Sequence, residues 1–260
     1  MRVLFIGDIF ARPGRQAVNE LLPSLRHSSG FDVVIANVEN AAGGNGVTVP
    51  VIDEIVSAGV DVMTSGNHIW DKREGLELIE QGTVLRPANY PLDAPGVGST
   101  VFRFGDGKSL GVISLQGRVF MKPIDCPFRA ARREIERLRN ETTSIFIDFH
   151  AEVTSEKVAL GRYLDGDVSA IVGTHTHIAT ADEQILPEGT AYLTDAGMTG
   201  SHDSVIGVDA GGAMSRFISG LPYPRMEPAK QGVKLCGVII EIEESSGLAR
   251  SIERISLPLD

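Results

Sequence analysis

Short apolar runs alternate along the chain with longer segments whose apolar residues recur at helical spacing. The runs are apolar at successive positions, which is the pattern of strands buried on both faces of a sheet. We therefore predict central strands at residues 2–7, 32–38, 60–66, 144–149 and 168–173. Helices are expected near 14–26, 50–58, 72–80, 127–139 and 155–164, with Asp71 and either Thr154 or Ser155 as N-caps. This alternation predicts an α/β protein.

Two further segments have the pattern of β-hairpins. Residues 99–115 flank a turn around Gly105-Asp106-Gly107, and residues 233–257 flank one around Ser245-Ser246-Gly247. We expect these hairpins to form a second, partly antiparallel sheet that packs beside the first. Residues 221–232 have the composition of a loop, and no internal repeat or linker divides the chain. A single domain over residues 1–260 is therefore expected.

Composition limits the classes of protein to which the chain can belong. Its 260 residues are 42% hydrophobic and 22% charged, which is typical of a soluble globular protein. No apolar run approaches the roughly 18 residues that a membrane span needs, so we expect no membrane association. The net charge of -10 argues against extended binding of DNA or RNA, because affinity for polyanions comes mainly from Lys and Arg.

The two cysteines and the N-terminus bear on the cellular compartment. Cys126 and Cys236 lie far apart and form no CxxC pair, so neither a disulfide framework nor a zinc ribbon is indicated. The short apolar stretch of "MRVLFIGD" is followed by Asp8 without a cleavage pattern, which favours a strand over a signal peptide. We expect a cytoplasmic protein.

Side chains that can bind metal follow nearly every predicted strand. In an open α/β sheet, ligands gather outside the carboxyl ends of the strands, so these positions are the first place to look for chemistry. The side chains found there are Asp8, Glu39, Asn40, Asn67, His68, His150, His175 and His177. If the strands are parallel neighbours, these side chains converge on one rim of the sheet.

Each of these residues also has an ordinary structural explanation. Asp8 could cap the next helix, Glu39 and Asn40 could begin a turn, and a lone histidine more often lies in a loop or core than on a metal. The combination favours a site, because four of the six histidines follow strands together with carboxylates and amides. That mixture suits Fe, Mn, Zn or Co better than Ca, and it exceeds the needs of one ion. Two metal ions are therefore expected.

Several ordered motifs resemble those of calcineurin-like metallophosphoesterases. They are "GD" at 7–8, "ENAAGG" at 39–44, "GNHIWD" at 66–71, "DFHAE" at 148–152 and "GTHTH" at 173–177. More narrowly, the chain resembles the bacterial YmdB-like group, regarded as cyclic-nucleotide phosphodiesterases, and this similarity includes "LTDAGMTG" at 193–200 and "DSVIG" at 203–207. It runs over essentially the whole chain. It implies two packed mixed β-sheets flanked by helices, the α/β/β/α sandwich of metallophosphoesterases.

The resemblance also implies roles for the candidate residues. One metal would be held by Asp8, Glu39, Asn40 and His177, and the other by Glu39, Asn67, His150 and His175, with Glu39 bridging. The ions would be divalent or mixed-valence, Fe and/or Mn, with Zn and Co as alternatives, and His68 would be the proton donor. Two positions depart from the broad superfamily, where a histidine is usual at Phe10 and an aspartate at Glu39. Asn40 is the candidate replacement for the missing histidine, and both departures match the narrower group.

These residues predict a two-metal phosphodiesterase for small cyclic nucleotides, with either a 2',3' or a 3',5' linkage. A metal-bridging hydroxide would attack phosphorus in line, and His68 would protonate the departing sugar oxygen. Two alternatives remain. The same site could serve a phosphomonoesterase or nuclease, or the protein could regulate by binding a nucleotide without turnover. The resemblance also makes a homo-oligomer an expectation.

Further residues are candidates for supporting roles. Arg118 could contact the substrate phosphate, with a surface salt link as the equal alternative. Asp148, Glu152 and Asp195 could accept hydrogen bonds from metal-bound imidazoles, or could instead be helix caps and surface acids. Residues 41–49 and 117–127 are expected to be loops that shape the pocket.

Overall fold

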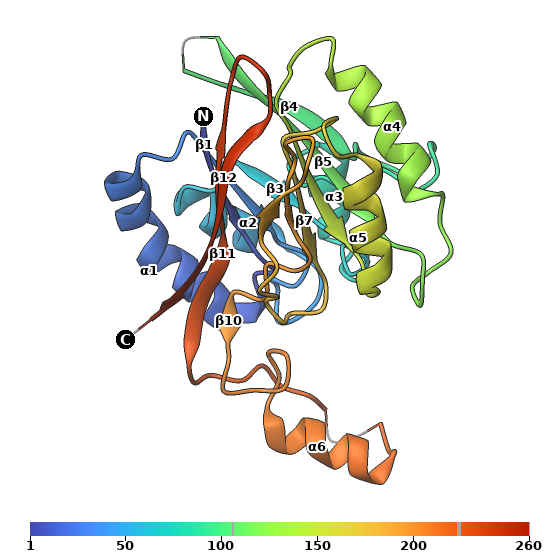
Figure 1. The fold of residues 1–260 in the computed structure, drawn as a ribbon. Helices are drawn as coiled ribbons and strands as arrows, with labels where there is room; N and C mark the ends of the chain where they lie inside the picture. The colour runs from blue at the N-terminus through green and yellow to red at the C-terminus, as the bar shows by residue number, and fades with distance from the viewer. Residues whose placement is uncertain (106, 223–224, 260) are drawn as a thin grey trace.

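The computed structural model describes residues 1–105, 107–222 and 225–259, and it has the predicted α/β architecture of two mixed sheets with flanking helices (Figure 1). The first sheet contains β1 (Arg2–Ile6), β2 (Val33–Asn37), β3 (Val62–Thr64), β10 (Gly200–Ser201), β11 (Val233–Ile242) and β12 (Ala249–Pro258). The second contains β4 (Ser99–Phe104), β5 (Lys108–Gln116), β6 (Ile145–His150), β7 (Ala170–Thr174), β8 (Gln184–Ile185) and β9 (Ala191–Leu193).

The predicted hairpins form, but they do not make a sheet of their own. The β4–β5 hairpin extends the second sheet because β5 pairs in parallel with β6, and β11 of the other hairpin pairs antiparallel with β1 in the first sheet. The predicted central strands are correspondingly divided, with β1 to β3 in the first sheet and β6 and β7 in the second. The two packed mixed sheets are confirmed, but the expectation that both hairpins belong to the second sheet was wrong. Asp106, in the predicted turn of the first hairpin, lies outside the described residues.

Alternating residues of β1 explain how the layers pack. Val3 and Phe5 point between the sheets, where the ring of Phe5 lies 5.0 Å from that of Phe146 in β6. Leu4 and Ile6 point to the opposite face and pack under helices. A strand with apolar residues on both faces is what a layer covered on both sides requires.

The helices cover the two outer faces and complete the sandwich. On the first sheet lie α1 (Ala11–Ser29), α2 (Val49–Ser57) and α3 (Gly75–Glu80). On the second lie α4 (Pro127–Leu138) and α5 (Thr154–Tyr163). The described residues contain no helix long and apolar enough to cross a membrane.

The predicted N-caps were wrong. The N-cap position of α3 is Glu74, because the residues after Asp71 form a turn before the helix begins, and the N-cap position of α5 is Val153. Neither helix has a side-chain capping hydrogen bond. Asp71 instead lies 2.7 Å from a ring nitrogen of His68.

A long excursion leaves the first sheet between β10 and β11. It comprises residues 202–222 and 225–232 and carries α6 (Ala210–Ser219), which projects from the body of the molecule in Figure 1. Its two arms form a stem: His202 N–H donates to Gly232 O (2.9 Å), and Ala229 N–H donates to Gly207 O (2.9 Å). Residues 223–224, within the segment predicted to be a loop, lie outside the described residues.

Candidate metal centre

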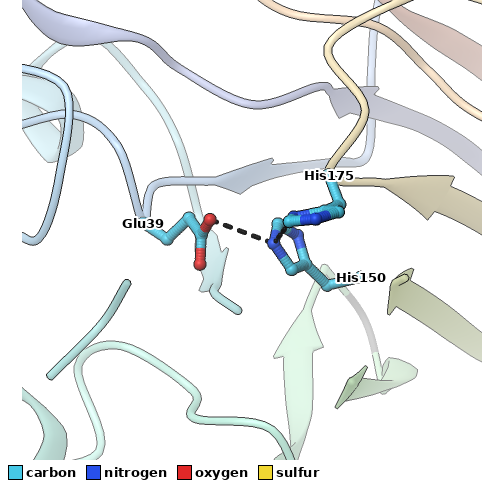
Figure 2. Close-up of side chains that lie close together, drawn as sticks. All are labelled: Glu39, His150 and His175. Atoms are coloured by element: carbon cyan, nitrogen blue, oxygen red, sulfur yellow. Dashed lines mark hydrogen bonds and ion pairs between the residues drawn. The ribbon is translucent and has the colours of Figure 1, made fainter. Parts of the chain in front are cut away.

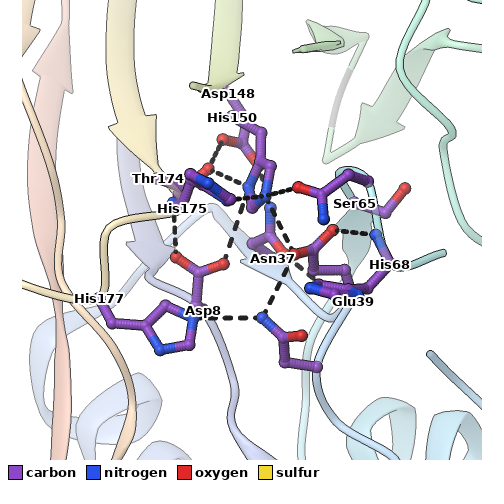
Figure 3. Close-up of polar contacts among 12 residues, drawn as sticks. Asp8, Asn37, Glu39, Ser65, His68, Asp148, His150, Thr174, His175 and His177 are labelled. Carbon is purple, nitrogen blue, oxygen red and sulfur yellow. Dashed lines mark hydrogen bonds and ion pairs between the residues drawn. The ribbon is translucent and has the colours of Figure 1, made fainter. Parts of the chain in front are cut away.

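The carboxyl ends of strands from both sheets meet at one rim (Figure 3). Asp8 and Glu39 follow β1 and β2 of the first sheet, and His150 ends β6 of the second. All three are wholly buried. The predicted convergence therefore occurs, but it is made by two sheets and not by parallel neighbours in one.

Three side chains from these strand ends form a compact cluster (Figure 2). Glu39, His150 and His175 each offer a ligand atom, and these atoms all lie within 4.8 Å of one another. His150 Nε2 lies 3.0 Å from Glu39 Oε1, 3.0 Å from His175 Nδ1 and 3.1 Å from Asn67 Oδ1. The four residues predicted to share one ion are thus adjacent.

The partners behind the two imidazoles decide which ring nitrogen carries a lone pair. Thr174 Oγ1 donates its single proton to Asp148 (2.7 Å). In its contact with His150 Nδ1 (2.9 Å) the hydroxyl must therefore be the acceptor, and Nδ1 the donor. Glu152 accepts from His175 Nε2 (3.0 Å). In the neutral rings, His150 Nε2 and His175 Nδ1 therefore carry lone pairs. These lone pairs face each other and the oxygens of Glu39 and Asn67, so a proton or a metal ion is needed among them.

The ionisation of the cluster fits this requirement. Burial would lower the pKa of His150, but the charge of Glu39 and its hydrogen bond raise it to about 9, so a proton meets part of the need. Burial would raise the pKa of Glu39, but His150 lowers it to about 2. Burial, reinforced by His150, lowers the pKa of His175 to about 3. Near neutral pH and without a bound metal ion, the cluster thus holds an ionised Glu39, a protonated His150 and a neutral His175.

A buried carboxylate oxygen beside this cluster also lacks a donor. Asp8 Oδ2 accepts from His175 N–H (3.0 Å), but Asp8 Oδ1 has no hydrogen-bond partner among the described residues and lies 3.8 Å from His150 Nδ1. Burial raises the pKa of Asp8, although His177 and His150 oppose this. Unsatisfied buried oxygens are rare, and a bound ion is one of the explanations for them. Together with the mixed imidazole, carboxylate and amide donors, this geometry fits a transition-metal ion.

The remaining predicted ligands lie on the other side of Glu39. His177 Nδ1 donates to Ile206 O (2.9 Å), which leaves Nε2 to accept from Asn40 Nδ2 (3.2 Å). Asn40 Nδ2 also donates to Glu39 Oε1 (3.3 Å). Asn40 and His177 are thus connected to the first cluster through the carboxylate predicted to bridge two ions.

The two histidines of "GTHTH" diverge because the backbone turns at both. Strand β7 ends at Thr174, and His175 and His177 have φ of 97° and 65°, a region that residues other than glycine seldom adopt. The ring of His175 lies 4.7 Å from that of His150, whereas the ring of His177 lies 5.5 Å edge-on from Phe10. Strained backbone of this kind clusters at functional sites.

A buried ion pair supports this turn. Thr176, between the two histidines, donates its N–H (3.2 Å) and its hydroxyl (2.8 Å) to Asp195 Oδ2. Lys157 Nζ of α5 donates to the same oxygen (2.7 Å), and both charged side chains are buried. Asp195 thus acts on the histidine turn through Thr176.

His68 lies at the mouth of the site. Its backbone N–H donates to Glu39 Oε2 (2.9 Å), and its side chain is 41% exposed. It lines a cavity of about 650 Å³ together with Glu39, His175 and His177. Of the loops expected to shape this cavity, 41–49 contributes Gly43, Gly44 and Asn45, and residues 117–127 do not line it.

Arg118 does not reach this cavity. It is exposed in the loop after β5, and its backbone N–H donates to Glu156 (3.1 Å). The cavity is lined by other residues, and its cationic side chain is Arg225. The role of Arg118 stays a prediction without a supporting contact.

Asp148 was a candidate acceptor for an imidazole, but no imidazole in the described part of the chain donates to it. It is buried behind His150, where it accepts from Asn37 (2.8 Å), Thr64 (2.5 Å) and Thr174 (2.7 Å), and burial raises its pKa to about 6. Glu152 contacts His175 and not His150. Thr174 and Ile206 lie inside the motifs "GTHTH" and "DSVIG", so the motifs were the available signal for them. Asn37, Thr64 and Lys157 carry no such signal.

Known proteins share the fold and the sequence. A solved structure of a hypothetical protein from Thermus thermophilus superimposes with a TM-score of 0.93 at 42% identity, covering 99% of both chains. A phosphatase from Mycoplasma pneumoniae superimposes with a TM-score of 0.91 at 32% identity, covering 99% of this chain and 93% of that one. The 2',3'-cyclic-nucleotide 2'-phosphodiesterase of Bacillus subtilis (strain 168) is 47% identical over 256 residues, which are 98% of this chain and 96% of that protein.

The fold and the site define an enzyme that hydrolyses phosphoric esters. The model of the family described as "YmdB-like protein" matches residues 4–255. The chain belongs to this YmdB-like family, so the resemblance carried by the sequence motifs is confirmed.

Proposed function

We propose that the protein is a metal-dependent phosphodiesterase that hydrolyses small cyclic nucleotides, with the 2',3' linkage as the first substrate to test. The observation that carries this proposal is the set of four facing lone-pair donors on Glu39, Asn67, His150 and His175 beside a cavity of nucleotide size. The activity named for the Bacillus subtilis relative supports the choice of linkage.

The residues divide into two sets that could hold two ions, Fe and/or Mn, with Zn and Co as alternatives. Asp8, Asn40 and His177 would hold one ion, Asn67, His150 and His175 the other, and Glu39 lies between the sets. When bound, such ions lower the pKa of water and neutralise charge on phosphoryl oxygens.

The chain itself would position and protonate the substrate. The contact between His68 Nδ1 and Asp71 fixes the orientation of the imidazole, and His68 lines the cavity beside Glu39. A protonated His68 could donate to the sugar oxygen that leaves, which is a poor leaving group without a proton. Asp71 would thus be a positioning residue for the general acid.

The first test measures metal content and hydrolysis of adenosine 2',3'-cyclic phosphate on the same preparations. Glu39→Ala should lose both bound metal and activity, because it removes the shared carboxylate. His68→Ala should keep its metal and lose roughly 10²- to 10⁴-fold in kcat, the contribution of one general acid. His27→Ala is the matched control, since His27 is exposed in the last turn of α1.

Other outcomes would contradict the proposal. Full activity of His68→Ala would exclude it as the proton donor, and a metal-loaded protein without turnover would favour a regulatory binding role. Because the Mycoplasma pneumoniae structure is that of a phosphatase, nucleoside monophosphates and a short RNA belong in the same assay. If either of these is hydrolysed faster than the cyclic nucleotide, the proposed substrate is wrong.

A further inference from the structure

The cavity at the metal centre has two unlike walls. One wall is polar and carries Glu39, His68, His175 and His177. The other is formed by the excursion, whose apolar lining side chains include Val205, Ile206, Val208, Phe217 and Met226, with Arg225 at the same wall. A ligand that fills this cavity therefore meets charge and metal ligands on one side and apolar surface on the other.

The apolar wall includes large side chains that are open to solvent. Phe217 is 83% exposed and Ile206 is 51% exposed. Exposed apolar side chains that border a cavity are typical of ligand sites, in which a few polar groups face apolar and aromatic ones. The next residue of α6, Ile218, is 87% exposed but does not line this cavity.

The motif "DSVIG" connects this wall to the metal centre. Ile206 has φ of 46°, a rare conformation for a β-branched residue. The turn is held by hydrogen bonds between the backbones of Val205 and Val208 (2.9 and 3.1 Å) and by Gly207 N–H donating to Ser204 Oγ (2.9 Å). In this turn the carbonyl of Ile206 fixes His177, while its side chain lines the cavity. One rigid turn therefore sets both the ligand and the wall.

The stem holds α6 in place beside this turn. Asp209 caps the helix by accepting from Gly212 N–H (2.8 Å), and its own N–H donates to Glu227 O (2.8 Å). Val208 forms a β-bridge with Pro228 in the other arm. These contacts keep Phe217, two turns into the helix, at the cavity that the candidate metal ligands also line.

We infer that the excursion is the nucleobase site of the substrate, with Phe217 as the surface on which the base stacks. This inference rests on the proposed function, because it takes the cyclic phosphate at the polar wall as its starting point. A cavity of about 650 Å³ lies within the usual range for small-molecule sites, so it accommodates the sugar and the base together with the phosphate. Helix α6 would then determine the preference for cyclic phosphates of nucleosides over cyclic phosphates without a base.

The test compares two substrates, adenosine 2',3'-cyclic phosphate and methyl riboside 2',3'-cyclic phosphate, which lacks a base. Phe217→Ala should lower the ratio of their kcat/KM values about tenfold, the loss of one base–aromatic stack. Phe217→Trp should retain the ratio. Ile218→Ala is the matched control, equally exposed on the same helix, and its ratio should equal that of the unchanged protein.

Equilibrium binding separates failure of this inference from failure of the proposed function. If the protein hydrolyses neither substrate, the proposed function is wrong, but binding of adenosine 3'-monophosphate against ribose 3-phosphate still tests the base site. The inference is supported if Phe217→Ala weakens the binding of adenosine 3'-monophosphate but not that of ribose 3-phosphate. It is overturned if the unchanged protein and Phe217→Ala bind adenosine 3'-monophosphate equally well. Dissociation of an oligomer by Phe217→Ala and by Ile218→Ala in analytical ultracentrifugation would also overturn it, because a second copy would then cover this face.

Discussion

Individual residues at this centre are set by what contacts them from behind. His150 presents Nε2 to Glu39, and His177 presents Nε2 to Asn40, because the Nδ1 atoms of the two rings face Thr174 Oγ1 and the carbonyl of Ile206. The tautomer of a metal-binding imidazole is commonly fixed in this way. The hydroxyl of Thr174 has one proton and donates it to Asp148, so it can only accept a hydrogen bond from His150.

Thr174→Val should weaken metal binding by roughly 10- to 100-fold while leaving the fold intact, because it removes the partner that orients His150. Titration of the chelator-treated protein with Mn²⁺ in a calorimeter measures this change. Thr190→Val is the matched control, because Thr190 is also buried and donates its hydroxyl to the carbonyl of Val168 (2.7 Å). An equal loss of affinity in both variants would assign the effect to general destabilisation.

Sequence alone proposes the candidate ligand side chains and three supporting acids, but not the contacts that those acids make. Each candidate ligand follows an apolar run closely, so its place at a strand end can be inferred locally. Asp148, by contrast, accepts from Asn37, Thr64 and Thr174, which lie on three other strands. Such contacts depend on strand order and register, which local patterns do not encode.

At the scale of elements, helices are joined to the sheets by charged contacts as well as apolar ones. Asp167, before β7, accepts from Arg139 Nη2 (2.8 Å) and from Arg132 of α4. Burial would raise the pKa of Asp167, but these hydrogen bonds and charges lower it overall. The contacts of Asp167 with these two arginines thus connect α4 to the loop that enters β7.

Asp167→Asn should destabilise the protein by about 1 kcal/mol at pH 7, the upper range for partly exposed ion pairs. A carboxylate with a lowered pKa stabilises above its ordinary pKa and loses that contribution as the pH falls through its folded value. The difference should therefore shrink below about pH 4. Urea unfolding of both proteins between pH 7 and pH 3 measures it, and a difference independent of pH would contradict this account. Asp53→Asn, exposed on α2, is the control.

The helices differ in how far their sequences predict them. For α2, α4 and α5 the predicted bounds agree within a residue, because apolar spacing changes abruptly at both ends. Helix α1 extends three residues beyond the prediction at each end despite Pro23 within it, because packing on the first sheet outweighs local preference. Helix α6 is not anticipated, since Gly211 and Gly212 lower its propensity and little apolar surface packs on it.

Across the whole molecule, the candidate metal centre lies between the two sheets. Asp8 and Glu39 come from the first sheet, and His150 and His175 come from the second. An ion bound between them would resist separation of the layers. Stability and catalysis would then depend on the same ligands.

Adding Mn²⁺ to the chelator-treated protein should therefore raise its melting temperature. At 100 times the dissociation constant, one site that binds only the folded state adds about 2.7 kcal/mol. Differential scanning calorimetry measures the shift, and Glu39→Ala should abolish most of it. An unchanged melting temperature despite stoichiometric binding would show that the ions do not hold the sheets together.

The architecture follows from the sequence, but the division of strands between sheets does not. Apolar runs identify β1, β2, β6 and β7, yet only pairing over long sequence distances assigns β5 to β6 and β11 to β1. Two expectations for the whole molecule, a single domain and a homo-oligomer, stay predictions.

The stem gives this protein a way to change over evolution. Both ends of the excursion leave adjacent strands, where Gly200 pairs with Lys234 and Ser201 with Val233. Residues added or lost beyond Asp209 would therefore leave the register of β10 and β11 intact. Descendants of one ancestor could diversify this segment freely while inheriting an unchanged rim of ligands.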